Sequence, residues 1–141
     1  MRAVLDANVI ISALLSRSGS PAVVLRAWQD GQFELIVSPL LLAELERALA
    51  YPKLRRRIPA EEADAVVGWL RRAATIVPDP DKPPPVSSRD PGDDYLLALA
   101  AAENALLVSG DEHLLALEGS LAGRLPIHSP AAFLGLLEGQ R

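Results

Sequence analysis

Short apolar runs alternate with longer stretches of helical periodicity from one end of this chain to the other. Strands are expected at residues 4–5, 33–37, 75–77, 106–108 and 126–128. Helices are expected at residues 9–15, 21–31, 39–50, 60–73, 93–103, 111–117 and 130–137. Because strands that are separated by helices pair in parallel through right-handed crossovers, this order predicts an α/β fold. The expected architecture is a three-layer α/β/α sandwich around a parallel sheet of about five short strands.

Three Ser-Pro pairs stand directly before apolar helical runs, at Ser20-Pro21, Ser38-Pro39 and Ser129-Pro130. A serine side chain caps the first backbone N–H groups of a helix, and proline is favoured at the first helical position. We therefore expect each serine to cap the helix that its proline begins. The proline-rich residues 78–85 are expected to form a stiff, exposed connection.

The length of the chain, 141 residues, predicts a single domain that spans residues 1–141. Half of the residues are hydrophobic, which is enough for a substantial core. Aromatic residues make up 4% of the chain, so broad platforms for stacking nucleic-acid bases are not expected. The net charge of −4 argues against a continuous basic surface but is compatible with a local basic stripe.

Cysteine is absent from the sequence, which excludes disulfides, thiolate metal sites and a cysteine nucleophile. No apolar stretch reaches the ~18 residues of a membrane span. The apolar run at the N-terminus is interrupted by Asp6 and Asn8 and lacks a convincing signal-peptide cleavage site. We therefore expect a cytoplasmic protein.

Two acidic residues come shortly after predicted strands. Asp6 ends the first strand, and Asp111 follows the strand at residues 106–108 after Ser109 and Gly110. In open α/β sheets, ligands gather at the carboxyl ends of the strands, near the point where the strand order reverses. Both residues are therefore candidates for an active site. The alternative for each is an N-cap of the helix that follows it.

Further acidic residues lie on two of the predicted helices. Glu44 and Glu46 border opposite edges of an apolar helical face, and periodicity alone favours neither. Asp93 shares a face with apolar residues, whereas Asp94 points elsewhere. A solvated helix surface is the alternative for the two glutamates, and a cap or a partner of the helix dipole is the alternative for Asp93.

If Asp6, Glu44, Asp93 and Asp111 converge, four carboxylates share one pocket and repel one another. A hard divalent cation such as Mg²⁺ or Mn²⁺ relieves this repulsion and prefers oxygen ligands. Its open positions hold a phosphate oxygen and a water molecule, which generates a nucleophile for displacement at phosphorus. The convergence of the four acids therefore predicts metal-dependent hydrolysis of phosphodiester bonds.

Four segments of the chain also match a known family in their order and spacing. They are Leu5-Asp6-Ala7-Asn8-Val9, Ser38 with Glu44-Leu45, Asp90-Pro91-Gly92-Asp93-Asp94-Tyr95-Leu96-Leu97-Ala98-Leu99-Ala100, and Leu107-Val108-Ser109-Gly110-Asp111. Over roughly residues 2–130, the chain resembles PIN-domain proteins. The resemblance is to the branch related to VapC-type ribonucleases, which are the toxins of toxin–antitoxin pairs.

This resemblance implies a metal-dependent endoribonuclease in a PIN-like fold. The implied catalytic residues and ligands of Mg²⁺ or Mn²⁺ are Asp6, Glu44, Asp93 and Asp111. The residues implied to support the pocket are Asn8, Ser109, Ser38 and Asp94. The resemblance selects Glu44 over Glu46 and Asp93 over Asp94, although a registration one residue later leaves Asp94 open as the ligand. His113 stands where this branch often has another acid.

Family members usually dimerise, and the toxins are held inactive by a small antitoxin protein, so the resemblance implies both partners. Contacts to the phosphates of the RNA substrate are expected from Arg17, Lys53, Arg55 and Arg56. A solvated helix end is the alternative for the basic cluster at residues 53–57.

Two other functions remain open. A PIN-like fold that has lost turnover would be a binding module for RNA or for a protein partner. A phosphatase would form an aspartyl-phosphate at Asp6, but such enzymes usually carry a second acid two residues later, where this chain has Asn8. A nucleotide-binding Rossmann domain is disfavoured because no glycine-rich turn follows the first strand.

Overall fold

The computed structural model describes residues 1–88, 90–117 and 125–140. Its strands are β1 (Arg2–Leu5), β2 (Glu34–Val37), β3 (Thr75–Ile76), β4 (Leu106–Val108) and β5 (Ile127–His128). They form one parallel sheet in the order β3-β2-β1-β4-β5. The predicted fold class is therefore confirmed.

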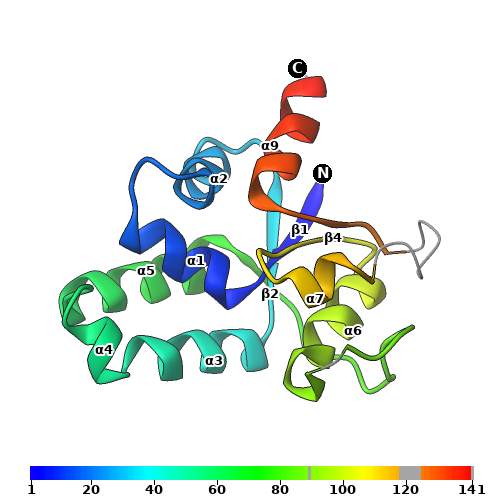
Figure 1. Ribbon diagram of the computed structural model, residues 1–141, viewed down its shortest axis with the longest axis horizontal. Coiled ribbons are helices and arrows are strands. Elements are labelled where there is room, and N and C mark those ends of the chain that lie inside the picture. Colours follow the sequence, from blue (N-terminus) through cyan, green and yellow to red (C-terminus); the bar gives the residue numbers. More distant parts are fainter. Residues whose placement is uncertain (89, 118–124, 141) are drawn as a thin grey trace.

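The helices lie on both faces of this sheet. They are α1 (Ala7–Leu15), α2 (Ser20–Gln29), α3 (Pro39–Leu49), α4 (Pro52–Arg55), α5 (Ala60–Ala73), α6 (Asp94–Ala102), α7 (Glu112–Leu115) and α9 (Pro130–Gly139), with a 3₁₀ turn η1 (Pro91–Asp93) before α6. Figure 1 shows α1, α4 and α5 to one side of the strands and α6 and α7 to the other. The chain changes face because it moves outward from β1 to β3 and then returns to the far side of β1 as β4.

The strand order reverses between β1 and β4. In this parallel pair Ala3 is opposite Leu106 and Leu5 is opposite Val108, so the two strands end at the same level. The backbone N–H of Asp6 donates to the carbonyl of Val108 at 2.9 Å and extends the pairing by one step. The residues that follow β1 and β4 consequently emerge side by side at the carboxyl edge of the sheet.

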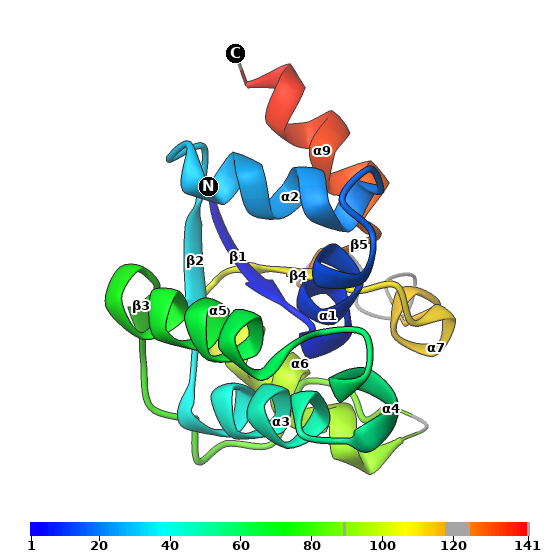
Figure 2. The same ribbon diagram turned by 90° about the vertical axis from the view of Figure 1, so that its left-hand side faces the viewer.

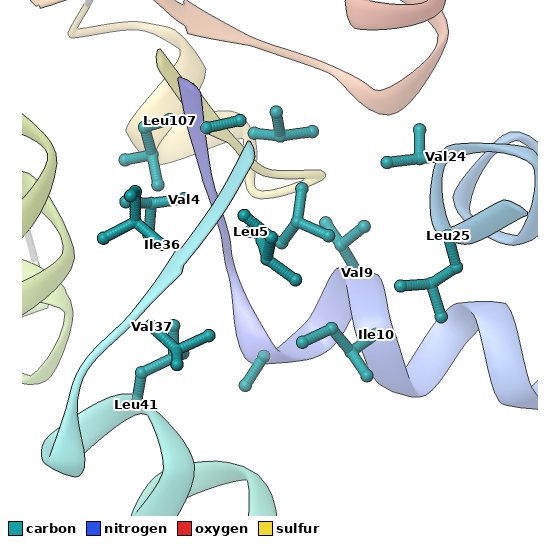
Figure 3. Close-up of a cluster of buried hydrophobic side chains, with 14 of the residues drawn as sticks. Val4, Leu5, Val9, Ile10, Val24, Leu25, Ile36, Val37, Leu41 and Leu107 are labelled. Carbon is teal, nitrogen blue, oxygen red and sulfur yellow. The ribbon is translucent and has the colours of Figure 1, made fainter. Parts of the chain in front are cut away.

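The core is built from apolar side chains on both faces of β1. Val4 and Leu5 are completely buried, as expected for neighbouring residues of a strand that is covered on both sides. In Figure 3, Leu5 lies towards Val9 and Ile10 of α1, whereas Val4 lies beside Ile36 of β2. Burial of each such side chain contributes about 1.5–3 kcal/mol, and this packing fixes where α1 begins relative to the end of β1.

A pair of tryptophans joins α2 to α5. The ring centroids of Trp28 and Trp69 are 4.2 Å apart, with an angle of 30° between the ring planes. Figure 2 shows both helices in front of the strands in that view. The rings therefore connect two helices of the same layer and are used for packing.

Two of the three predicted serine caps are confirmed. The hydroxyl of Ser38 accepts from the backbone N–H of Leu41 at 3.3 Å, and that of Ser129 accepts from the N–H of Ala132 at 3.1 Å. The prediction for Ser20 is wrong, because Ser20 lies inside α2 and Gly19 is the N-cap, without a side-chain hydrogen bond. Proline is tolerated one position later because the second N–H of a helix also lacks an intrahelical partner.

Two segments that connect the main elements differ in secondary structure. The basic segment after Tyr51 forms the one-turn helix α4, which the sequence did not predict. Residues 77–88 contain no helix or strand, but the carboxylate of Asp79 accepts from the backbone N–H of Leu40 at 3.0 Å. The proline-rich connection is therefore attached to the first turn of α3.

Among the described helices, no single one is long and apolar enough to cross a membrane. Helices α1 and α2 reach that length and composition only together, as a pair bent by 103°.

Candidate active site at the carboxyl ends of the strands

Asp6 is held at the end of β1 by hydrogen bonds to both of its carboxylate oxygens. It is the N-cap of α1, and its Oδ1 accepts from the backbone N–H of Asn8 at 3.1 Å. Its Oδ2 accepts from the hydroxyl of Ser109, which follows β4, at 2.9 Å. The residue is only 5% exposed. The carboxylate therefore caps α1, which was the alternative given for Asp6 from the sequence. It is also fixed in orientation beside a pocket.

This acid pocket has a volume of about 320 Å³ and collects residues from three parts of the chain. Those residues are Asp6, Ala7, Asn8, Glu44, Arg47, Ala48, Asp90, Gly92, Asp93 and Tyr95. The end of β1 and the start of α1 supply the first group, α3 supplies the second, and η1 with its flanking residues supplies the third. Four carboxyl groups thus face a single guanidinium group in the described lining.

Burial, together with the neighbouring negative charges, raises the pKa of two of these acids. Burial is the main reason that the pKa of Asp93 rises to about 6, and the charges of Asp6, Asp90, Asp111 and Glu44 raise it further. Burial also raises the pKa of Asp6, together with the charges of Asp111 and Glu44, while the hydrogen bonds from Asn8 and Ser109 oppose the rise. With four carboxyl groups and the one guanidinium of Arg47 in its described lining, the pocket has an excess of negative charge.

Tyr95 is the aromatic residue of the described lining. Burial, and then the charges of Asp6, Glu44 and Asp93, raise the pKa of its phenol. The hydroxyl consequently stays protonated at neutral pH and is able to donate a hydrogen bond into the pocket.

Glu44 and Arg47 form an ion pair one turn apart on α3. Both line the acid pocket, and their side chains are 40% and 63% exposed respectively. Glu46, the alternative acid, points instead to Arg71 of α5. The structure therefore places Glu44, and not Glu46, with Asp6 and Asp93.

Asp111 lies next to the acid pocket and is not among its described lining residues. Its Oδ1 accepts from the backbone N–H of His113 at 2.8 Å and caps α7, and its own N–H donates to the hydroxyl of Ser109 at 3.0 Å. It lines a neighbouring hollow together with Asn8, yet its charge still acts on Asp6 and Asp93. The structure thus brings three of the four predicted acids into one pocket and sets the fourth next to it.

Asp93 and Asp94 have different surroundings. Asp93 lines the acid pocket, whereas the carboxylate of Asp94 accepts from the backbone N–H of Ser88 at 2.8 Å. Asp94 therefore anchors the loop that precedes η1, which agrees with the helical phase expected from the sequence.

The other residues predicted to support the site occupy three kinds of position. Ser38 is fully buried and caps α3, the helix that carries Glu44. Ser109 is fully buried between Asp6 and Asp111. Asn8 uses its backbone N–H for Asp6, while its exposed side chain lines both the acid pocket and the neighbouring hollow.

The basic residues predicted to contact RNA lie outside the described lining of the acid pocket. Arg17, Lys53, Arg55 and Arg56 are all exposed, and the side chain of Arg55 donates to the carbonyl of Leu49 at 3.4 Å. Arg47 is the cation that the structure places in the pocket.

Three residues with polar side chains in the described lining were missing from the predicted site. Arg47 lies one helical turn beyond Glu44, so its position on the same face was a usable signal. Asp90 caps η1 through a bond from the N–H of Gly92 at 2.9 Å, and Tyr95 follows in the same acidic segment. No spacing rule points to either, because their placement depends on the path of the loop before α6.

The donor set of the acid pocket suits a hard divalent cation, since Asp6, Glu44 and Asp93 offer carboxylate oxygens with unrelieved repulsion. Within the described ranges, no three acidic or histidine side chains already surround a common point as metal ligands. Glu44 is engaged by Arg47 instead. The chemistry of the residues therefore fits such an ion, and one of the donors, Glu44, is paired with Arg47.

Comparison with known proteins gives matches over most of the chain. The sequence model of the PIN domain family matches residues 2–113. Uncharacterized protein MJ1680 of Methanocaldococcus jannaschii is 26% identical over 117 residues, which cover 83% of this chain and 75% of that protein.

Two solved structures resemble the fold. The first is VapBC2 from Rickettsia felis, bound to a DNA fragment from their promoter, with a TM-score of 0.61 and 16% identity over 92% of this chain and 98% of that one. The second is FitAcB from Neisseria gonorrhoeae, with a TM-score of 0.51 and 20% identity over 91% of this chain and 97% of that one. At these identities, the likeness establishes a shared fold.

Proposed function

This chain belongs to the PIN domain family, and from that premise we propose that it is a metal-dependent endoribonuclease that hydrolyses phosphodiester bonds in RNA. The observation that carries the proposal is the acid pocket. Asp6, Glu44 and Asp93 come from three separate parts of the chain and line one hollow, where burial and mutual repulsion raise the pKa of Asp93 to about 6.

Mg²⁺ or Mn²⁺ is the proposed cofactor, held by Asp6, Glu44 and Asp93 with Asp111 beside them. When bound, such an ion lowers the pKa of a coordinated water and neutralises charge on a phosphate. Ser109 and the N–H of Asn8 keep the carboxylate of Asp6 in one orientation, which is the support that a metal ligand requires.

Arg47 is proposed to exchange partners when the site is loaded. Its guanidinium now pairs with Glu44. If the carboxylate of Glu44 bound the metal ion, the guanidinium of Arg47 would be available to a phosphate oxygen of the RNA. Its fork of N–H donors is well suited to that contact. Arg17, Lys53, Arg55 and Arg56 are the proposed contacts to more distant phosphates.

We also propose that the protein is the toxin of a toxin–antitoxin pair. The resemblance to VapC-type ribonucleases supports this role, and so does the shared fold with the VapBC2 and FitAcB structures. A small antitoxin protein and a second copy of this chain are the implied partners. Co-expression with the product of a short neighbouring reading frame, followed by size-exclusion chromatography, tests both associations.

The nuclease proposal is tested with the purified full chain, freed of metal and then supplied with Mg²⁺ or Mn²⁺ and single-stranded RNA. We expect internal cleavage that requires the metal and falls by roughly two orders of magnitude in Asp6→Asn. Glu46→Gln is the matched control, because Glu46 pairs with Arg71 outside the pocket. Absence of cleavage with both metals, or equal cleavage by Asp6→Asn, would overturn the proposal.

The second candidate is a PIN-like binding module without turnover, and the engagement of Glu44 by Arg47 is the observation that favours it. Such a module would bind RNA or a protein equally well with and without metal and would tolerate Glu44→Gln. An aspartyl-phosphate phosphatase is less favoured, because the exposed Asn8 stands where those enzymes carry a second acid.

A further inference from the structure

A second hollow adjoins the acid pocket on the other side of Asn8. It has a volume of about 350 Å³, and its lining residues are Asn8, Val9, Ser12, Pro21, Gly110, Asp111 and Pro130. We call it the proline hollow. Asn8 lines both hollows, and Ser109, which supports Asp6, is two residues from Asp111. The two hollows are therefore adjacent compartments at the same edge of the sheet.

The lining of the proline hollow divides into an apolar part and a polar part. Val9, Pro21 and Pro130 form the apolar part, with Val9 and Pro130 largely buried and Pro21 half-buried. Asn8 and Ser12 provide an amide and a hydroxyl, and Asp111 has one carboxylate oxygen engaged with the N–H of His113. None of the described lining residues is a lysine or an arginine, so the hollow offers a phosphate no cationic partner.

We propose that the proline hollow binds one nucleoside of an RNA substrate, next to the phosphate that occupies the acid pocket. This inference rests on the proposed nuclease function and adds a base-binding subsite to it. A nucleobase has apolar faces and a polar edge, as the hollow has, and a volume of about 350 Å³ lies in the usual range of about 300–1,000 Å³ for small-molecule sites.

The polar groups of the hollow match the exposed edges of a nucleoside. The side-chain amide of Asn8 offers two donors and an acceptor to a base edge. The carboxylate of Asp111 accepts from an exocyclic amine or from the 2′-hydroxyl, which is the group that distinguishes RNA from DNA. Asp111 and the lack of a lysine or arginine in the described lining disfavour a phosphate in this hollow. The acid pocket instead has Arg47 and the proposed metal ion to receive the phosphate, so the base enters the proline hollow and the backbone stays on the side of the acid pocket.

Gly110 and Ser12 allow the hollow to be filled without disturbing the fold. A Cβ placed on Gly110 meets nothing within 4 Å, and the backbone there does not need positive φ. Gly135, an exposed residue of α9, is equally open and serves as the matched control. Ser12 is an exposed residue of α1, so Ser12→Trp occludes the hollow from a second element.

The first test is binding, measured without metal by NMR of the ¹⁵N-labelled full chain. The probes are adenosine, cytidine, guanosine and uridine, added singly, with inorganic phosphate as the comparison. We expect at least one nucleoside to shift the amides of Ser12 and Gly110. The affinity should fall at least about tenfold in Gly110→Leu, because its side chain fills the volume, and remain unchanged in Gly135→Leu. No shift with any nucleoside, or an equal shift with phosphate, would overturn the inference.

The second test is the sequence context of RNA cleavage on a pool with randomised positions. Gly110→Leu and Ser12→Trp should both alter the nucleotide preference at the same position beside the cut, while Gly135→Leu keeps the wild-type preference. Wild-type preference in both filled variants contradicts the subsite even if cleavage occurs. Nucleoside binding without any cleavage instead contradicts the nuclease function and leaves the hollow established as a nucleoside site.

Discussion

The hydroxyl of Ser109 lies 2.9 Å from Oδ2 of Asp6, although the two residues are 103 positions apart in the sequence. The hydroxyl oxygen of Ser109 also accepts from the backbone N–H of Asp111 at 3.0 Å. A single buried side chain thus connects the two acids that follow β1 and β4. The parallel pairing of Leu5 with Val108 makes the contact possible, because it brings the ends of both strands to the same level.

Replacement of this hydroxyl should affect both stability and activity. Ser109→Ala leaves Oδ2 of a buried carboxylate without its partner, so we expect a loss of about 1–3 kcal/mol in the free energy of unfolding. The pKa of Asp6 should rise further, since the bond from Ser109 lowers it, and RNA cleavage should fall roughly 10- to 100-fold. Urea denaturation and initial rates measure the two effects.

Ser109→Thr is the control for that prediction, because it keeps the hydroxyl at the buried position. Its cleavage rate should stay close to that of the wild type, even if the added methyl group costs some stability. Equal rates in Ser109→Ala and Ser109→Thr would show that the hydrogen bond to Asp6 has no part in the activity.

The raised pKa of Asp93 predicts a specific dependence of stability on pH. Its ordinary value is 3.8 and its value in the folded chain is about 6, so between these values the folded state holds the proton more tightly than the unfolded state. Stability therefore decreases as the pH rises through this window. Asp93→Asn should remove this contribution and gain about 1 kcal/mol over the wild type at pH 7, after allowance for solvent screening.

Urea denaturation of both proteins between pH 4 and pH 8 measures this difference, since the acids outside the acid pocket contribute equally to each. Asp94→Asn is the matched control and should follow the wild-type curve, because it leaves Asp93 unchanged. A constant difference between Asp93→Asn and the wild type at every pH would contradict the raised pKa of Asp93.

Replacement of Arg47 in the acid pocket should have opposite effects on the binding of Mn²⁺ and of RNA. Arg47→Gln frees the carboxylate of Glu44 and adds to the net negative charge, so Mn²⁺ should bind roughly threefold to tenfold more tightly. The same variant should raise KM for RNA, because a phosphate contact is lost. Isothermal titration with Mn²⁺ and steady-state kinetics measure these changes.

Arg71→Gln is the control for Arg47, since Arg71 of α5 pairs with Glu46 of α3 outside the acid pocket. It should leave both the Mn²⁺ affinity and KM near their wild-type values. Weaker Mn²⁺ binding in Arg47→Gln would show that the ion pair helps to form the site and does not compete with it.

Substitution of the neighbouring acids Asp93 and Asp94 should show which one is a metal ligand and which one has a structural role. Asp93→Ala should lower the Mn²⁺ affinity at least about tenfold, the loss expected when a metal site is disturbed. Asp94→Ala should keep that affinity and instead lose about 1 kcal/mol of stability, because the N–H of Ser88 loses its acceptor at 2.8 Å. Titration with Mn²⁺ and thermal unfolding of both variants give the comparison, and the reverse pattern would assign the ligand to Asp94.

Local sequence signals were sufficient to locate the strands and most helix starts. The caps at Ser38 and Ser129 join atoms only three residues apart, and the apolar runs of the strands are contiguous, so short-range patterns record them. Ser20 shows where this reasoning stops, because proline is acceptable at either of the first two helical positions and does not mark the boundary to one residue.

The sequence alone therefore determined the order of strands and helices and the residues that follow each strand, including Asp6 and Asp111. The presence of Asp90, Arg47 and Tyr95 in the acid pocket, and of Asp111 beside it, depends on the folded chain. The physical reason is that hydrogen bonding and periodicity act within a few residues of the chain. The composition of a pocket instead depends on how helices turn and pack against the sheet, and those contacts join segments that are far apart in sequence.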